Sequence, residues 1–248
     1  MRILALDSSG LVAGVAVVES AEDGADAKTI AEYTVNYKKT HSQTLLPMLD
    51  EVAKMTELDL ASIDAVAVAA GPGSFTGLRI GSATAKGLGL ALAKPLVPVP
   101  TLEGLAYNLC GVGGIICPVM DARRGQVYTG IYRFPDGERL EVVEDQMAVS
   151  IEELAEKLQH YGEEVTFLGD GVPVFRRRLE EELLKGEKIR FAPAHMNRQR
   201  AASVGALALR YYAEGKTETA AQHRPDYLRV SQAERERKER MEHDTVSM

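Results

Sequence analysis

Cysteine, histidine and tryptophan are scarce in this sequence, which excludes several kinds of site. The 248 residues include two cysteines, five histidines and no tryptophan. Two cysteines cannot form a disulfide framework or a four-cysteine zinc site, and the apolar surroundings of Cys110 and Cys117 predict buried thiols. No two histidines have HxxH or HxxxH spacing, so no metal cluster is expected. The histidines are His41, His160, His195, His223 and His243.

Basic residues are in the minority. Lys and Arg number 29 against 36 Asp and Glu, which gives a formal net charge of −7. A protein that binds nucleic acid by itself normally presents a basic surface, so the composition argues against that function. The chain is 45% hydrophobic and 26% charged, which is typical of a globular protein with one large or two small domains.

Long hydrophobic runs are absent as well. The longest uncharged stretch lies between Glu103 and Asp121, falls short of a membrane span and is broken by glycines and Pro118. The apolar run after Met1 and Arg2 is too short for the core of a secretory signal. We therefore expect a cytoplasmic protein without a membrane segment.

The first hundred residues predict an α/β unit with a mixed sheet. Strand-like runs and amphipathic helices follow one another in the order β-β-β-α-β-α. The expected strands are Ile3–Leu6, Val12–Val18, Ile30–Tyr37 and Ala65–Ala70. One expected helix begins at Thr40 or Ser42, and the other spans Phe75–Ala93.

The same order returns after a boundary marked by three prolines, Pro95, Pro98 and Pro100, and a short helix from Thr101 to Cys110. The second set comprises strands Ile115–Met120, Gln126–Phe134, Leu140–Val149 and Val165–Leu168, and helices Ile151–Tyr161 and Val174–Leu184. This duplication predicts two domains, residues 1–105 and 106–199. A helix at Ala201–Ala213, within a segment of about 200–228, is expected to rejoin the first domain. The mixed-charge tail 229–248 is expected to be a solvated helix or a frayed end.

Two turns could hold a phosphate. Asp7-Ser8-Ser9 ends the first strand, where ligands bind in open α/β sheets. Gly71–Arg79 joins a buried strand to a helix N-terminus, which attracts anions; it lacks the Gly-Lys-Ser/Thr of a P-loop. The alternative is that both are plain turns, one satisfying its own backbone and the other capping a helix. The candidate contacts are Asp7, Ser8, Ser9, Gly71, Gly73, Ser74, Thr76 and Arg79.

Two weaker candidates lie in the second half. Asp121–Gly125 repeats the strand–Asp–turn arrangement with two arginines, which could bind a phosphate or a carboxylate. The tripeptide Gly169-Asp170-Gly171 could cover a nucleotide base, although it is more often a plain turn. No Ser/His/Asp or Cys/His catalytic set can be assembled, so no catalytic residue is assigned.

Small residues recur every fourth position along the helix after Gly71–Ser74. Such a ridge lets another helix approach closely, and interior glycines cost about 1 kcal/mol each, so the ridge needs a reason. We expect a subunit interface here, the alternative being packing within the chain. The predicted interface residues are Leu45, Leu49, Val52, Gly77, Gly81, Ala85 and Gly89.

Three segments together resemble the bacterial TsaB (YeaZ) family: ILALDSSG, VAVAAGPGSFTGLRIGSATAKGLGLALAKPLVPVPTLEGLA and PVMDARRGQVYTGIY. The resemblance runs from Met1 to about Leu228. It implies a duplicated actin/sugar kinase/Hsp70 ATPase-like (ASKHA) fold. It also implies a role in making N6-threonylcarbamoyladenosine at position 37 of tRNA, as the non-catalytic partner of the paralogous transferase TsaD and of the ATPase TsaE.

One departure from TsaD bears on catalysis. TsaD has two metal-binding histidines in a His-Leu-Glu-Gly-His stretch, and this chain has Thr101 and Leu105 at those positions. A site that loses two nitrogen ligands is not expected to hold a transition metal. The chain itself is therefore expected to need no metal or other cofactor.

The resemblance also bears on ligands and partners. It allows ATP or ADP at the interface of the complex, a homodimer when the chain is alone, and contact with tRNA only through the complex. The alternative is an independent enzyme, a metal-dependent kinase or a glycoprotease-like peptidase, using Asp7, Ser9 and the Gly71–Thr76 loop.

Overall fold

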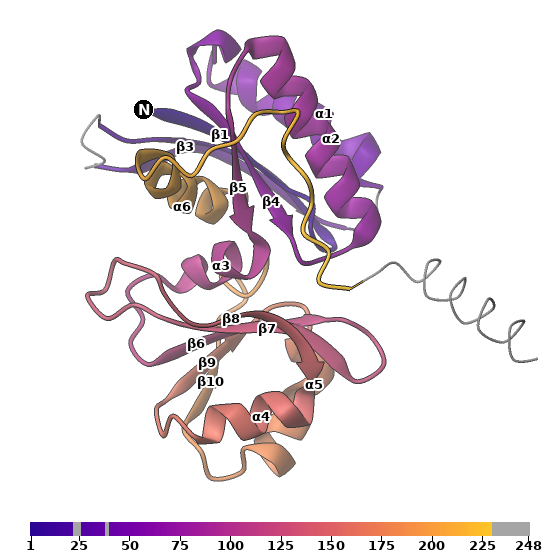
Figure 1. Cartoon of the computed structure of the whole chain (residues 1–248), viewed down its shortest axis with the longest axis vertical. Helices are drawn as coiled ribbons and strands as arrows, with labels where there is room; N and C mark the ends of the chain where they lie inside the picture. The colour runs from indigo at the N-terminus through magenta and orange to yellow at the C-terminus, as the bar shows by residue number, and fades with distance from the viewer. Residues whose placement is uncertain (22–25, 38–39, 230–248) are drawn as a thin grey trace, which may run out of the picture.

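The computed structural model describes residues 1–21, 26–37 and 40–229, and shows two lobes built from five alternating layers (Figure 1). The first sheet has the order β3-β2-β1-β4-β5. Its strands are β1 (Arg2–Asp7), β2 (Val12–Glu19), β3 (Lys28–Asn36), β4 (Ala65–Gly71) and β5 (Leu96–Pro100). β1 pairs antiparallel with β2 and parallel with β4.

The second sheet repeats this arrangement. Its order, β10-β9-β6-β7-β8, is that of the first sheet with each strand replaced by its counterpart. β6 pairs antiparallel with β7 and parallel with β9, as β1 does with β2 and β4. The strands are β6 (Ile115–Asp121), β7 (Gln126–Arg133), β8 (Glu141–Ser150), β9 (Val165–Leu168) and β10 (Ile189–Phe191). This duplication of a mixed α/β unit confirms the predicted ASKHA-type fold.

Helices cover both faces of each sheet. In the first lobe α1 (His41–Met55) and α2 (Phe75–Leu92) pack on the face that includes Leu4 and Leu6, and α6 (Ala201–Ala213) packs on the opposite face, which includes Ile3 and Ala5. Alternate residues of β1 serve the two faces because strand side chains alternate in direction. In the second lobe α4 (Ile151–Gln159) and α5 (Val172–Arg178) cover one face. The other face receives α3 (Thr101–Ala106), between the lobes.

The structure corrects four details predicted from the sequence. The proline-rich segment is the edge strand β5, where a missing N–H is tolerated, and Ile189–Phe191 adds the short edge strand β10. The helix expected to reach Leu184 leaves α-helical geometry after Arg178 and continues as a π-helical turn. Cys117 is buried as predicted, but Cys110 is exposed.

The tail predicted at 229–248 lies outside the described residues except for Arg229. Among the described residues no helix combines the length and the hydrophobicity required to cross a bilayer.

The small-residue ridge of α2 faces inward, so its assignment to a subunit interface was wrong. A Cβ on Gly77 would clash with the carbonyl oxygen of Ser8, and one on Gly81 would lie 2.5 Å from Ser8 Oγ. The ridge therefore lets α2 approach the end of β1. All seven predicted interface residues are buried within the lobe: Leu45, Leu49, Val52, Gly77, Gly81, Ala85 and Gly89.

This packing makes a testable prediction from two glycines of one helix. Gly77→Ala should destabilise the fold by about 1–3 kcal/mol, because its methyl group meets backbone atoms that cannot move aside. Gly87→Ala, whose methyl group enters open space, should stabilise it by about 0.5–1 kcal/mol. Chemical denaturation followed by circular dichroism measures both. Equal stability of the two variants would contradict the inward orientation of the ridge.

Candidate functional site

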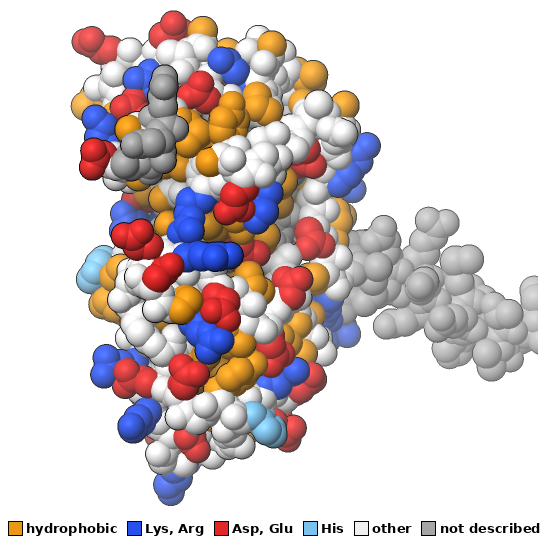
Figure 2. Space-filling model, turned by 60° about the vertical axis from the view of Figure 1, so that its left-hand side comes forward, with side chains coloured by type: hydrophobic (Ala, Val, Ile, Leu, Met, Phe, Trp, Pro, Cys, Tyr) orange, Lys and Arg blue, Asp and Glu red, His pale blue; other side chains and the backbone are white. Residues whose placement is uncertain are grey.

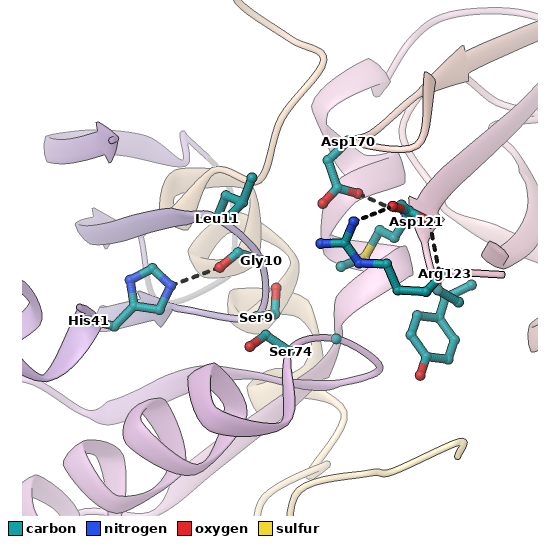
Figure 3. Close-up of a pocket in the computed structure, with 12 residues that line it drawn as sticks. Ser9, Gly10, Leu11, His41, Ser74, Asp121, Arg123 and Asp170 are labelled. Atoms are coloured by element: carbon teal, nitrogen blue, oxygen red, sulfur yellow. Dashed lines mark hydrogen bonds and ion pairs between the residues drawn. The ribbon is translucent and has the colours of Figure 1, made fainter. Parts of the chain in front are cut away.

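A cleft of about 360 Å³ lies between the lobes, at the carboxyl ends of β1 and β6 (Figure 3). The first lobe contributes the turn after β1, the start of α1 and the loop before α2, and the second lobe contributes the end of β6 and its turn, one residue of β7 and Asp170. The lining residues are Ser9, Gly10, Leu11, His41, Gly73, Ser74, Met120, Asp121, Ala122, Arg123, Tyr128 and Asp170.

Equivalent aspartates close equivalent turns on the two sides of the cleft. Asp7 Oδ1 accepts hydrogen bonds from the backbone N–H of Ser9 at 2.9 Å and from its hydroxyl at 2.7 Å. Asp121 Oδ1 accepts from the backbone N–H of Arg123 at 2.8 Å, and its other oxygen pairs with that guanidinium at 3.1 Å. Both carboxylates thus stabilise their own turns, which was the alternative considered for Asp7.

The loop before α2 is packed directly on the first of these turns. The N–H of Ser74 donates to the carbonyl oxygen of Ser9 at 2.7 Å, and a Cβ on Gly73 would clash with that oxygen. The hydroxyl of Ser8 donates to the carbonyl oxygen of Gly77 at 2.9 Å. Ser74 also caps α2, its hydroxyl accepting from the N–H of Gly77. The polar groups of both turns are therefore largely used within the protein.

Burial determines the titration of two carboxyls at the cleft. Desolvation raises the pKa of Asp7, against the opposing effect of its hydrogen bonds with Ser9. Desolvation also raises the pKa of Asp170, whose Oδ1 accepts from the N–H of Asp121 at 3.2 Å. Neither carboxyl has a basic side chain within ion-pair distance among the described residues, and Arg123 is paired with Asp121 instead.

Three of the eight predicted phosphate contacts line the cleft: Ser9, Gly73 and Ser74. Asp7 and Ser8 are buried beneath it, and Gly71 lies against the backbone of Asp226. Thr76 and Arg79 are exposed on α2, with the Arg79 guanidinium 4.4 Å from the centre of the Phe75 ring.

The structure also brings together residues that were weak candidates or were missed. The cleft is lined by Asp121, Arg123 and Asp170, the weaker candidates of the second half. Their positions are those that a binding site at the turn after β6 would need. His41 was missed as a lining residue, because no spacing in the sequence relates the start of α1 to the turn after β1.

The described part of the cleft lacks an activated nucleophile. A serine becomes a nucleophile when a neighbouring base accepts its proton. The imidazole of His41 donates from Nε2 to the carbonyl oxygen of Gly10 at 2.8 Å, and no hydrogen bond from it to a serine occurs among the described residues. The hydroxyl of Ser9 donates to Asp7, but both residues are buried, so this pair does not present an accessible nucleophile. This arrangement does not favour acyl transfer or peptide hydrolysis.

The two positions that bear histidines in TsaD do not fit a metal here. The hydroxyl oxygen of Thr101 accepts from the N–H of Gly71 at 3.1 Å, and Leu105, on α3, is a buried apolar residue packed on the second sheet. No group of three or more metal-ligating side chains occurs in the described part of the chain.

A second candidate surface is the solvent-facing side of α1 and α2, called the outer face below. On α2 it consists of Thr76, Arg79, Ala83, Gly87 and Leu90, and on α1 of Gln43, Leu46, Pro47, Asp50 and Lys54. Leu46 and Leu90 remain 55% and 71% exposed. Ala83 and Gly87 repeat the four-residue spacing of the inner ridge, so α2 presents small residues on both sides.

Comparison with known proteins identifies the family. The family model described as TsaD, tRNA N6-adenosine threonylcarbamoyltransferase, matches residues 28–237. The tRNA threonylcarbamoyladenosine biosynthesis protein TsaB of Bacillus subtilis is 36% identical over 237 residues, covering 94% of this chain and 96% of its own. The chain belongs to the TsaB family. TsaB of Escherichia coli is 30% identical and covers 92% of this chain and 95% of its own.

The solved structures agree with this TsaB assignment. YeaZ from Pseudomonas aeruginosa superimposes with a TM-score of 0.75 at 26% identity, covering 92% of this chain and 99% of that one. The likeness therefore extends over both lobes and the connection between them.

Asp7 allows a test of the site's electrostatics. Because burial raises its pKa above the ordinary 3.8, the folded chain keeps a proton that the unfolded chain loses as the pH rises. Asp7→Asn, which retains the oxygen that accepts from Ser9, should therefore gain stability relative to the unmodified protein over the range from about pH 4 upward. Urea denaturation across this range measures the difference. A difference that shrinks or reverses with rising pH would show that the carboxylate is instead stabilised by its surroundings.

Proposed function

We propose that this chain is a non-catalytic subunit of the machinery that makes N6-threonylcarbamoyladenosine at position 37 of tRNA, and that it pairs with a TsaD-type transferase. The proposal draws on the names of its relatives, which are biosynthesis proteins of this modification. The observation that carries it is the replacement of both metal-binding histidines by Thr101 and Leu105, the first engaged by the backbone and the second in the core.

The outer face of α1 and α2 is the proposed docking surface for TsaD. This surface lies on the same two helices as the interface predicted from the sequence, but on the opposite side of α2. Small residues at Ala83 and Gly87 allow a second helix to approach closely, and the exposed Leu46 and Leu90 supply apolar area to bury. The Arg79 guanidinium, which no described carboxylate pairs, would suit an acidic side chain of the partner. In the absence of TsaD the same face would support a homodimer.

Nucleotide and tRNA enter this proposal through the complex. The chain alone requires no cofactor, and ATP or ADP would bind where the complex is assembled, with TsaE supplying the ATPase. On the face shown in Figure 2, acidic and basic side chains are interspersed over both lobes. This distribution, with a net charge of −7, favours contact with tRNA mainly through the partners. The proposal includes a cytoplasmic location for the complex, since it would act on tRNA.

One substitution on the outer face tests the docking surface. Ala83→Glu should weaken binding to TsaD by about tenfold or more, because the longer side chain fills the space that a close helix contact needs and can pair with Arg79 four residues earlier, which removes that cation from the partner. Ala213→Glu is the matched control, since Ala213 is also an exposed helical alanine but lies on α6, across the sheet. Both variants should fold, and calorimetric titration with TsaD measures their affinities. Equal affinities would exclude the outer face as the interface.

A reconstituted reaction tests the assignment as a subunit. With tRNA, threonylcarbamoyl-adenylate, TsaD and TsaE, omission of this chain should abolish modification measured by nucleoside mass spectrometry. The chain alone should not hydrolyse peptides, because the described cleft lacks an accessible nucleophile paired with a base, and it should not hydrolyse ATP, because in this proposal TsaE supplies the ATPase. Turnover by the isolated chain would instead support the independent kinase or peptidase, and full modification without it would refute the proposed role.

A further inference from the structure

The last described segment, residues 216–229, crosses from one lobe to the other outside both sheets. It leaves the end of α6, runs over the first lobe and descends beside the junction of the lobes, where it is yellow in Figure 1. This segment, called the strap below, has no helix or strand of its own apart from one bridge to β5. None of the functions discussed above uses it.

The strap is firmly attached to the first lobe. Glu218 and Leu96 exchange backbone hydrogen bonds of 2.8 and 2.9 Å, which attach the strap to the edge strand β5. His223 is fully buried and contacts Glu218 through Nδ1, and its carbonyl oxygen accepts from Lys86 on α2. These contacts fix the path of the strap along the flank of α2.

The end of the strap passes over the carboxyl end of β4. The N–H of Asp226 donates to the carbonyl oxygen of Ala70 at 2.7 Å. A Cβ on Gly71 would clash with the carbonyl oxygen of Asp226, so the close approach requires glycine there, at a φ of 126°. The centre of the Tyr227 ring then lies 4.8 Å from the centre of the Phe75 ring, at the start of α2. The strap thus reaches the loop that lines the cleft.

Two side-chain hydrogen bonds then reach the second lobe. Gln146 on β8 donates from Nε2 to the carboxylate of Asp226 at 2.7 Å. Arg229 donates from Nη1 to the carbonyl oxygen of Ala122 at 2.9 Å. Ala122 itself lines the cleft, and Ala70 lies three residues before the lining residue Gly73. The strap therefore joins the two walls of the cleft next to its opening.

We infer that Asp226–Arg229 is a latch that limits the separation of the lobes and so sets the width of the cleft. The lobes are also joined by the two chain crossings, through α3 and through the segment between β10 and α6, and by the hydrogen bond from Arg210 on α6 to the carbonyl oxygen of Glu138, which lies between β7 and β8. Both latch bonds are made by exposed or half-buried side chains, whose net strength is small. Their loss should therefore leave each lobe folded while allowing a wider range of lobe separations.

Distances between spin labels on the two lobes test the latch. Labels at Glu51→Cys on α1 and Arg177→Cys on α5, both exposed, report lobe separation in the full chain carrying Cys110→Ser. In this background the double variant Asp226→Ala/Arg229→Ala should shift the mean distance upward and broaden its distribution. An unchanged distribution would overturn the inference.

Arg224→Ala is the matched control, because within the described part of the chain that guanidinium binds only carbonyl oxygens of the strap itself, at Ala221 and His223. It should leave the distribution unchanged, and equal broadening by this variant would overturn the inference by showing that general loosening of the strap suffices. Circular dichroism checks that each variant is folded. If the double variant were unfolded, Gln146→Ala replaces it, because this substitution removes one latch bond and leaves the strap intact. Broadening of the distance distribution in Gln146→Ala would support the latch, and an unchanged distribution would overturn it.

Discussion

The close packing of α2 on the turn after β1 is the constraint on which the first lobe depends. Gly77 and Gly81 leave room for Ser8, whose hydroxyl binds the backbone of α2. The same contact holds the Ser74 N–H on the turn that Asp7 closes, and so shapes one wall of the cleft. It also orients α2 so that Ala83, Gly87 and Leu90 face solvent, where we propose that a partner docks.

The duplicated halves have kept their topology and diverged in their turns. Asp7 and Asp121 close corresponding turns, but small hydroxyl residues follow the first and arginines follow the second. The Arg123 guanidinium is directed back to Asp121, and Asp170 has no ion-pair partner among the described residues, so the second wall is not a copy of the first. A TsaB-family scaffold whose polar groups are engaged internally, and which has Thr101 and Leu105 where the resemblance to TsaD implies histidines, supports the proposed role as a subunit that assists chemistry on a partner.

The sequence predicted most strands and helices because their apolar patterns are strong: Val165–Leu168 and Ala201–Ala213 coincide with β9 and α6. It missed β5 because Pro98 argues against a central strand but is tolerated at an edge. The four-residue ridge of α2 was recognised, but periodicity alone does not say which side of a helix meets the sheet. His41 could not be placed at the cleft either, since its position depends on how α1 follows the antiparallel meander of β1, β2 and β3.

Hydroxyl-radical footprinting of the complex tests the central claim, that this chain acts as a subunit through the outer face of α1 and α2. Leu46 and Leu90 on that face, and Val174 on the second lobe, are all at least half exposed and so serve as comparable probes. Addition of TsaD should lower the oxidation of Leu46 and Leu90 and leave that of Val174 unchanged. Protection of Val174 with unaltered oxidation of Leu46 and Leu90 would contradict the account.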